Sequence, residues 1–148
     1  MANNFTDQSE NGLALLIFNR TSYAAMGLVD STGPTTFYLS LHSADPGEAG
    51  DATAYEVSGL TGYARKPLTR SSGSGGITVS AGIGSNASAI VFTITAGTPV
   101  LATYAGLSIY ASGAGALFAK GLISSGGVTL GNGITATCAI GAFTFEIS

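Results

Sequence analysis

The clearest alternation of apolar and polar positions in the chain runs through residues 36–43. Phe37, Leu39 and Leu41 fall on one side of an extended segment, and polar side chains ending with His42 fall on the other. A period of two residues is typical of a strand that is buried on one face only. The pattern therefore predicts a half-buried strand, with His42 pointing outward beside an acidic turn.

A tight turn is expected directly after this strand, at Asp45-Pro46-Gly47. Proline presets φ for the first central position of a turn, and glycine takes the positive φ that a type II turn requires at the second. The strand therefore leads into an acidic loop, which is closed by Gly62-Tyr63-Ala64-Arg65.

Short apolar segments separated by Gly or Ser follow one another along the rest of the chain. They predict strands at 36–43, 63–70, 77–81, 89–95, 104–111, 116–122, 134–140 and 143–147. About eight short strands without a later helix indicate an all-β fold, a single jelly-roll-like β-sandwich of antiparallel strands. Pro67 implies an edge strand or a bulge, because proline cannot donate a ladder hydrogen bond. The residues expected to face the core are Leu39, Leu41, Ile90, Phe92, Ile94, Leu107, Ile109, Leu117, Phe143 and Phe145.

One helix is expected near the N-terminus, starting at the capping residue Ser9. Its apolar stripe is formed by Leu13, Leu16 and Ile17, with Arg20 at the next helical step. The helix either docks on a partner or covers an edge of its own sheet, and we favour the second alternative. Residues 1–8 are polar and unpatterned, so we expect an N-terminal arm (1–8) followed by a single domain (9–148).

The charged residues are few and unevenly distributed. Eleven of the thirteen lie within the first 70 positions, which leaves Lys120 and Glu146 in the remaining 78. Such a neutral chain fits a protein that packs against copies of itself or against a lattice, although an ordinary β domain with a hydroxyl-rich face is the alternative. The only basic cluster, at residues 65–70, is not interleaved with aromatic residues, so we expect no nucleic-acid binding.

The chain offers little catalytic chemistry, because His42 is the only histidine and Cys138 the only cysteine. A Ser-His-Asp arrangement of His42 with Asp45 lacks the strained nucleophile turn. We therefore expect no enzyme, no catalytic residue and no cofactor, and we expect Cys138 to act as a small buried hydrophobe. The apolar run 13–18 is too short to cross a bilayer and no basic signal region precedes it, which predicts synthesis in the host cytoplasm without membrane insertion.

Four acidic residues gather in the loop that follows the first strand. Carboxylates of this kind suit calcium, but their spacing does not match the regular calcium loop, so no metal site is predicted. Ion pairs with basic residues of the same or a neighbouring subunit are the preferred interpretation, because they set register at an interface. A pair of glycosidase carboxylates is a weaker option in a chain without Trp. The candidate interface consists of Asp45, Glu48, Asp51, Glu56, Arg65, Lys66 and Arg70.

The same loop carries a resemblance to a known family. The chain reads L-H-S-A-D-P-G from Leu41, then E-V-S-G from Glu56, then Y-A-R from Tyr63. It resembles a family of small tailed-bacteriophage virion structural proteins whose pattern reads L-H-T-A-D-P-G, then E-V-S-G-x-x-Y-A-R. The resemblance covers about residues 10 to 147, and it departs at Ser43 and in an Ala-, Gly- and Thr-rich C-terminal half.

This resemblance implies a non-enzymatic part of a phage particle that assembles as a homotrimer. Family members are described as head decoration proteins or as tail-fibre-like proteins. We expect first a capsid decoration (cement) protein on the outer capsid surface, which binds the major capsid protein and stabilises the expanded shell by mass action. The alternative is a tail-tip or tail-fibre component that binds a host surface glycan, and an enzyme acting on that glycan is a third option.

Overall fold

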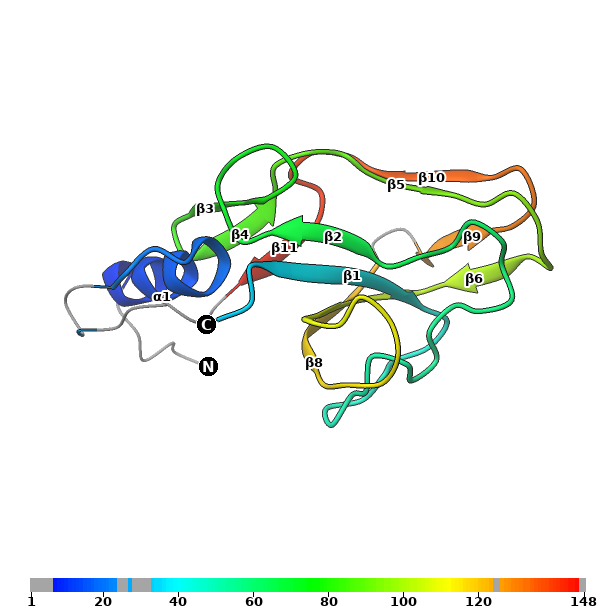
Figure 1. Cartoon of the computed structure of the whole chain (residues 1–148), viewed down its shortest axis with the longest axis horizontal. Coiled ribbons are helices and arrows are strands. Elements are labelled where there is room, and N and C mark those ends of the chain that lie inside the picture. Colours follow the sequence, from blue (N-terminus) through cyan, green and yellow to red (C-terminus); the bar gives the residue numbers. More distant parts are fainter. Residues whose placement is uncertain (1–6, 24–26, 28–32, 124–125, 147–148) are drawn as a thin grey trace. The chain divides into compact units, whose positions relative to one another are not determined.

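The computed structural model describes residues 7–23, 27, 33–123 and 126–146. These residues form one α-helix and short strands (Figure 1). The elements are α1 (Asp7–Asn19), β1 (Thr36–His42), β2 (Lys66–Thr69), β3 (Ile77–Ser80), β4 (Ile83–Asn86), β5 (Ile90–Thr93), β6 (Val100–Ala102), β7 (Tyr104–Ser108), β8 (Leu117–Leu122), β9 (Val128–Leu130), β10 (Thr135–Cys138) and β11 (Thr144–Glu146).

The strands form four small sheets, with the orders β2-β1-β7-β8, β11-β4-β3, β10-β5 and β6-β9. The pairs β1–β7, β7–β8, β3–β4, β4–β11 and β6–β9 are antiparallel. A mostly β fold with an N-terminal helix is thus confirmed. The jelly-roll arrangement itself stays a prediction.

The predicted strands all overlap observed ones, but the structure adds three that the pattern did not predict, β4, β6 and β9. β4 has the sequence Ile-Gly-Ser-Asn, which lacks strand propensity. β6 and β9 have three residues each and pair only with one another. The expected edge position of Pro67 is confirmed, because β2 is the end strand of its sheet.

The chain divides into two compact units. Unit 1 comprises the described residues of 1–36, 68–90 and 138–148, and unit 2 comprises those of 37–67 and 91–137. Each unit is considered by itself below.

In unit 1, α1 packs on β3 and β4 (Figure 1). Ala14 and Phe18 are buried, and the Phe18 ring stacks on Phe145 with 5.5 Å between the ring centroids. Gly84 makes this packing possible, because a Cβ there would lie 2.8 Å from the Phe18 ring. The helix therefore covers its own sheet, as preferred from the sequence, although the expected Leu13 stripe is only half-buried. α1 begins at Asp7, before the predicted cap, and residues 1–6 of the expected arm lie outside the described residues.

In unit 2, the core of the four-stranded sheet lies along β1 and β7. Leu39 pairs with Leu107, and both are buried. The prediction that Ile109 faces the core is wrong: β7 ends at Ser108 and the Ile109 side chain is 45% exposed. Leu117 in this unit and Phe143 in unit 1 are half-buried, and the other predicted core residues are buried.

Candidate functional site in the loop between β1 and β2

The loop begins with the predicted turn. Asp45 Oδ1 accepts a hydrogen bond from the Gly47 N–H at 2.8 Å, and Gly47 has a φ of +80°. This is the positive φ that a type II turn requires at the glycine. Pro46 is buried between them, so the turn is packed as well as hydrogen-bonded.

Beyond the turn, the chain returns to the end of β1. The N–H of Ser43 donates to Tyr55 O, and the N–H of Val57 donates to Leu41 O, both at 2.9 Å. His42 and Glu56 thereby form an isolated antiparallel bridge. This backbone pairing fixes the position of the Glu56 carboxylate.

Arg65 closes the loop through a bidentate ion pair with Glu56. Arg65 Nε lies 2.8 Å from Glu56 Oε1 and Nη2 lies 2.7 Å from Oε2. The Arg65 and Glu56 side chains are only 2% and 16% exposed. The hydrogen bonds with Glu56 raise the pKa of Arg65, which keeps the guanidinium charged.

The same guanidinium also holds backbone carbonyls. Arg65 donates to the carbonyl oxygens of Ala52, Tyr110 and Gly113, at 3.0, 3.0 and 2.8 Å. It therefore ties its own segment to the loop near Ala52 and to the segment after β7. Truncation of this side chain would release three parts of unit 2 at once.

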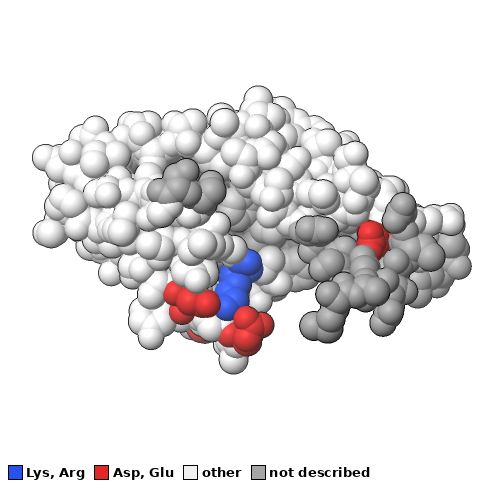
Figure 2. Space-filling model, turned by 180° about the vertical axis from the view of Figure 1, so that it is seen from behind, with Lys and Arg blue, Asp and Glu red and all other residues white. Residues whose placement is uncertain are grey.

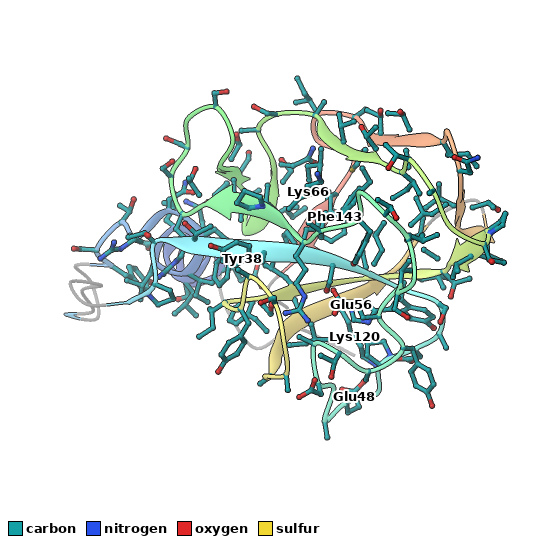
Figure 3. The ribbon with its side chains drawn as sticks, turned by 45° about the vertical axis from the view of Figure 1, so that its right-hand side comes forward. Tyr38, Glu48, Glu56, Lys66, Lys120 and Phe143 are labelled. Carbon is teal, nitrogen blue, oxygen red and sulfur yellow. The ribbon has the colours of Figure 1, made fainter. Side chains whose placement is uncertain are left out.

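Tyr63 joins the two conserved-looking parts of the loop motif. Its hydroxyl accepts from the Leu41 N–H at 2.9 Å and donates to Glu56 Oε1 at 3.2 Å. The ring stacks on Phe92 with 5.9 Å between centroids, and burial raises the pKa of the Tyr63 hydroxyl. Glu56 of E-V-S-G thus meets both Tyr63 and Arg65 of Y-A-R, and Figure 3 shows Glu56 within this loop.

His42 lies inside the unit, so the prediction that it points outward is wrong. His42 Nδ1 is 2.7 Å from Ala54 O, and Ser40 Oγ is 2.8 Å from Nε2. A carbonyl oxygen only accepts, so Nδ1 carries the proton and Nε2 accepts from Ser40. Both side chains are fully buried, and burial lowers the pKa of His42. The alternating pattern could not show this, because the returning loop covers the second face of β1.

Gly106 on the neighbouring strand provides the room for this pair. A Cβ at Gly106 would lie 2.7 Å from His42 Nε2 and 2.8 Å from Leu117. These distances are shorter than van der Waals contact, so the position accepts only glycine without a shift of its neighbours.

Asp51 is used within the loop. Its Oδ1 accepts from the N–H and the hydroxyl of Thr53, at 2.8 and 2.5 Å, and its Oδ2 accepts from the Gly115 N–H at 2.9 Å. These hydrogen bonds lower the pKa of Asp51. The carboxylate therefore connects the loop with the segment that enters β8.

Asp45 and Glu48 contact Lys120 of β8 at the surface. Lys120 Nζ lies 2.6 Å from Asp45 Oδ1 and 3.0 Å from Glu48 Oε1, and Glu48 is 96% exposed. The hydrogen bond with Lys120 lowers the pKa of Asp45. Glu48 and Lys120 lie close together in Figure 3, and Figure 2 shows basic atoms flanked by acidic ones on an otherwise almost uncharged face.

The remaining two basic candidates lie elsewhere. Lys66 Nζ sits 5.5 Å from the centroid of the Phe92 ring. Arg70 belongs to unit 1, where it is buried and donates to the carbonyl oxygens of Leu16, Ile17 and Pro34 at 3.0, 2.5 and 2.7 Å. Leu16 and Ile17 are in the last turn of α1, so Arg70 caps that helix end.

The structure thus brings five of the seven predicted residues into one loop and separates the other two. Within the described part of the chain, no three His, Cys, Asp or Glu side chains are placed to hold a metal ion. Cys138 is half-buried, and burial raises the pKa of its thiol. Tyr63 and Lys120 were missed as site residues, although Y-A-R was the signal that contained the first. Across the described ranges, α1 does not have the length or apolarity of a membrane span.

Two comparisons bear on identity. No curated protein is significantly similar to the chain. Residues 5–146 match the model of a protein family described as podophage GP4 fiber I protein gp80. This match covers the helix, the loop with its buried Glu56–Arg65 pair and all the described strands. The chain therefore belongs to this family of phage virion structural proteins.

Proposed function

We propose that the chain is a non-enzymatic structural component of a podophage tail fibre. The observation that carries this proposal is the match of residues 5–146 to a family described as a fibre protein. The description favours the tail-fibre alternative over the capsid decoration protein that we expected first. A head location, with the major capsid protein as partner, is therefore the competing outcome of the test.

The charge distribution supports a role in packing against other virion proteins. No charged residue occurs between positions 71 and 119 or between 121 and 145. Seven strands, β3 to β7, β9 and β10, consequently carry no charge. A protein surface with few charges loses little solvation free energy when it is covered.

The buried ion pair of unit 2 supports a rigid loop. Arg65 and Glu56 use their polar atoms inside the chain, so they serve the loop's conformation instead of a partner. The side chains that the loop leaves to solvent include Tyr55, which is 61% exposed, and Glu48. A held loop presents these groups without the entropy cost of ordering it on binding.

Receptor-glycan binding is a second candidate function of the fibre, and Tyr55 is the observation that favours it. Aromatic rings on a surface provide apolar platforms with a polar tip. If the loop binds a host glycan, Tyr55→Ala should reduce adsorption of phage to its host while particle assembly is unchanged. Unchanged adsorption would leave the purely structural role.

The absence of an enzyme is part of the proposal, and buried chemistry supports it. His42 and Ser40 are both fully buried, so no substrate reaches them. Asp51 and Glu56 accept hydrogen bonds within the chain, and Asp45 contacts Lys120. Replacing Asp45 and Glu48 by their amides should leave host-glycan integrity and infectivity unchanged, and a loss of glycan degradation would contradict this part.

The location on the particle tests the main proposal. Gold-labelled antibodies raised against the purified chain should mark the tail of intact virions in electron micrographs. Antibodies against the major capsid protein, used on the same particles, provide the control that marks the head. Label distributed over the head would overturn the fibre assignment and restore the decoration protein.

A further inference from the structure

We propose that the outer edge of β8 pairs with β8 of a second copy of the chain about a twofold axis. The two four-stranded sheets would then continue into each other. This interaction surface goes beyond the fibre assignment and does not depend on it.

The two edges of the four-stranded sheet differ in how they are protected. The end strand β2 carries Lys66 and Pro67, and both residue types are typical of edges that do not pair with other chains. The end strand β8 carries Phe118 and Leu122, which are 50% and 70% exposed. One edge is therefore blocked, and the other presents apolar side chains.

Only the beginning of β8 is covered within the chain. The N–H of Leu117 donates to Gly50 O at 3.0 Å, and Asp51 forms a bridge with Ala116. Among the strands of the described residues, none pairs with β8 on its outer side. Residues 118–122 are thus the part of the edge that a second strand can extend.

The backbone directions define one register for such a pair. The N–H of Ile123 donates to Thr103 O at 2.8 Å, which lies on the β7 side. Because N–H directions alternate along an antiparallel strand, the N–H groups of Lys120 and Leu122 point to the outer edge. A twofold axis at Lys120 joins these groups with the carbonyl groups of the second copy.

This register also matches the exposed apolar side chains. It places Phe118 of one copy opposite Leu122 of the other, on both sides of the axis. Cross-strand pairs of an aromatic and an aliphatic residue stabilise antiparallel sheets. Phe118 can keep its stack on Phe37, at 5.3 Å between centroids, because the pairing uses the half of its surface that is exposed.

The charges around the axis are compatible with this pairing. Two Lys120 side chains would approach each other, and directly opposed like charges destabilise a sheet. Each Lys120, however, already lies between Asp45 and Glu48 of its own chain. Glu48 is 96% exposed, so its carboxylate can also reach Lys120 of the second copy.

A second copy fits this edge because the register is self-complementary. The trimer expected from the family resemblance requires a different, heterologous contact, since a twofold contact uses the same surface on both copies. The mass in solution therefore distinguishes the two arrangements, and another virion protein on β8 is a further outcome of the test.

Sedimentation equilibrium of the purified chain tests the proposal. The mass should be twice that of the 14.6 kDa chain. Leu122→Lys should raise the dissociation constant about tenfold or more, because the side chain is buried twice in the pair. Leu122→Pro should do the same by removing an outward N–H, and Ile140→Lys is the matched control, since Ile140 is 69% exposed and lies outside β8.

Two readouts protect the test against a folding artefact. Urea unfolding of each variant should give the free energy of the unchanged protein, because Leu122 is largely exposed. A photo-crosslinker at position 122, in a mixture of isotopically labelled and unlabelled chains, should connect to the peptide that contains Phe118 of another copy. A monomer at all concentrations, a trimer, an equal effect of Ile140→Lys, or crosslinks from virions to a different protein would each overturn the proposal.

Discussion

Arg65 and Arg70 lie five positions apart and are both buried, yet each organises a different unit of the chain. Arg65 binds a carboxylate bidentately and holds three carbonyl groups around the loop of unit 2. Arg70 binds the last carbonyl groups of α1 in unit 1. A basic cluster in the sequence is therefore divided between two interiors and does not form a surface patch.

The difference teaches how a chain with few charges uses those it has. A buried charge is tolerated only where hydrogen bonds replace its hydration. Glu56 and backbone carbonyls provide that replacement for Arg65, and the end of a helix provides it for Arg70. The expected effects of substitution follow from these two environments.

Arg65→Met should give the largest loss of stability, about 3–5 kcal/mol in the free energy of unfolding, because Glu56 would remain largely buried without its partner. Urea denaturation measures this loss. Arg65→Lys, which retains the charge but not the bidentate geometry, should lose less, and Lys66→Met is the control for a basic residue of the same segment. Equal stability of Arg65→Met and the unchanged protein would contradict the role of the ion pair.

Arg70→Met should cost about 2–3 kcal/mol, because carbonyl groups at the end of α1 lose a charged donor. The loss should be local. Amide hydrogen exchange should become faster in α1, while the loop at residues 51–57 keeps its protection. Arg65→Met should show the reverse pattern, and faster exchange in both regions for either variant would argue against separate organising roles.

A pH titration sharpens the comparison, because His42 lies near Arg65 but changes its charge. The pKa of buried His42 is lowered from 6.5, so below that pH the unfolded chain binds more protons than the folded one. Stability should therefore fall as the pH decreases from about 7.5 to about 5.5. The decrease should be absent in His42→Gln, and a slope that persists in this variant would assign it to other groups.

Lys120→Met should have the smallest effect, because its contacts with Asp45 and Glu48 are exposed. NMR titration should show the pKa of Asp45 rising toward the ordinary value of 3.8. Any stabilisation by this contact is present above that value and is lost as the pH falls through the lowered pKa of Asp45. An unchanged Asp45 titration would show that the contact is not formed in solution.

The sequence allowed the β-rich class, the N-terminal helix and the turn at Gly47 to be predicted, because these depend on local periodicity and on glycine conformation. His42 and Ile109 were placed on the wrong side, because their burial depends on where a loop returns and where a strand ends. Glu56 and Arg65 were recognised as possible partners, but only the fold shows that Tyr63 joins them and that Arg70 does not. β4 was missed because Gly84 serves the packing of Phe18 and not strand propensity.

The central claim is that the chain is a tail-fibre component of a phage particle, and its copy number tests this most directly. Quantitative mass spectrometry of purified virions gives the ratio of this chain to the major capsid protein. The account predicts a ratio far below one, equal to that of other tail proteins. A ratio close to one, or a fixed fraction set by the threefold sites of the shell, would contradict it and identify a capsid decoration protein.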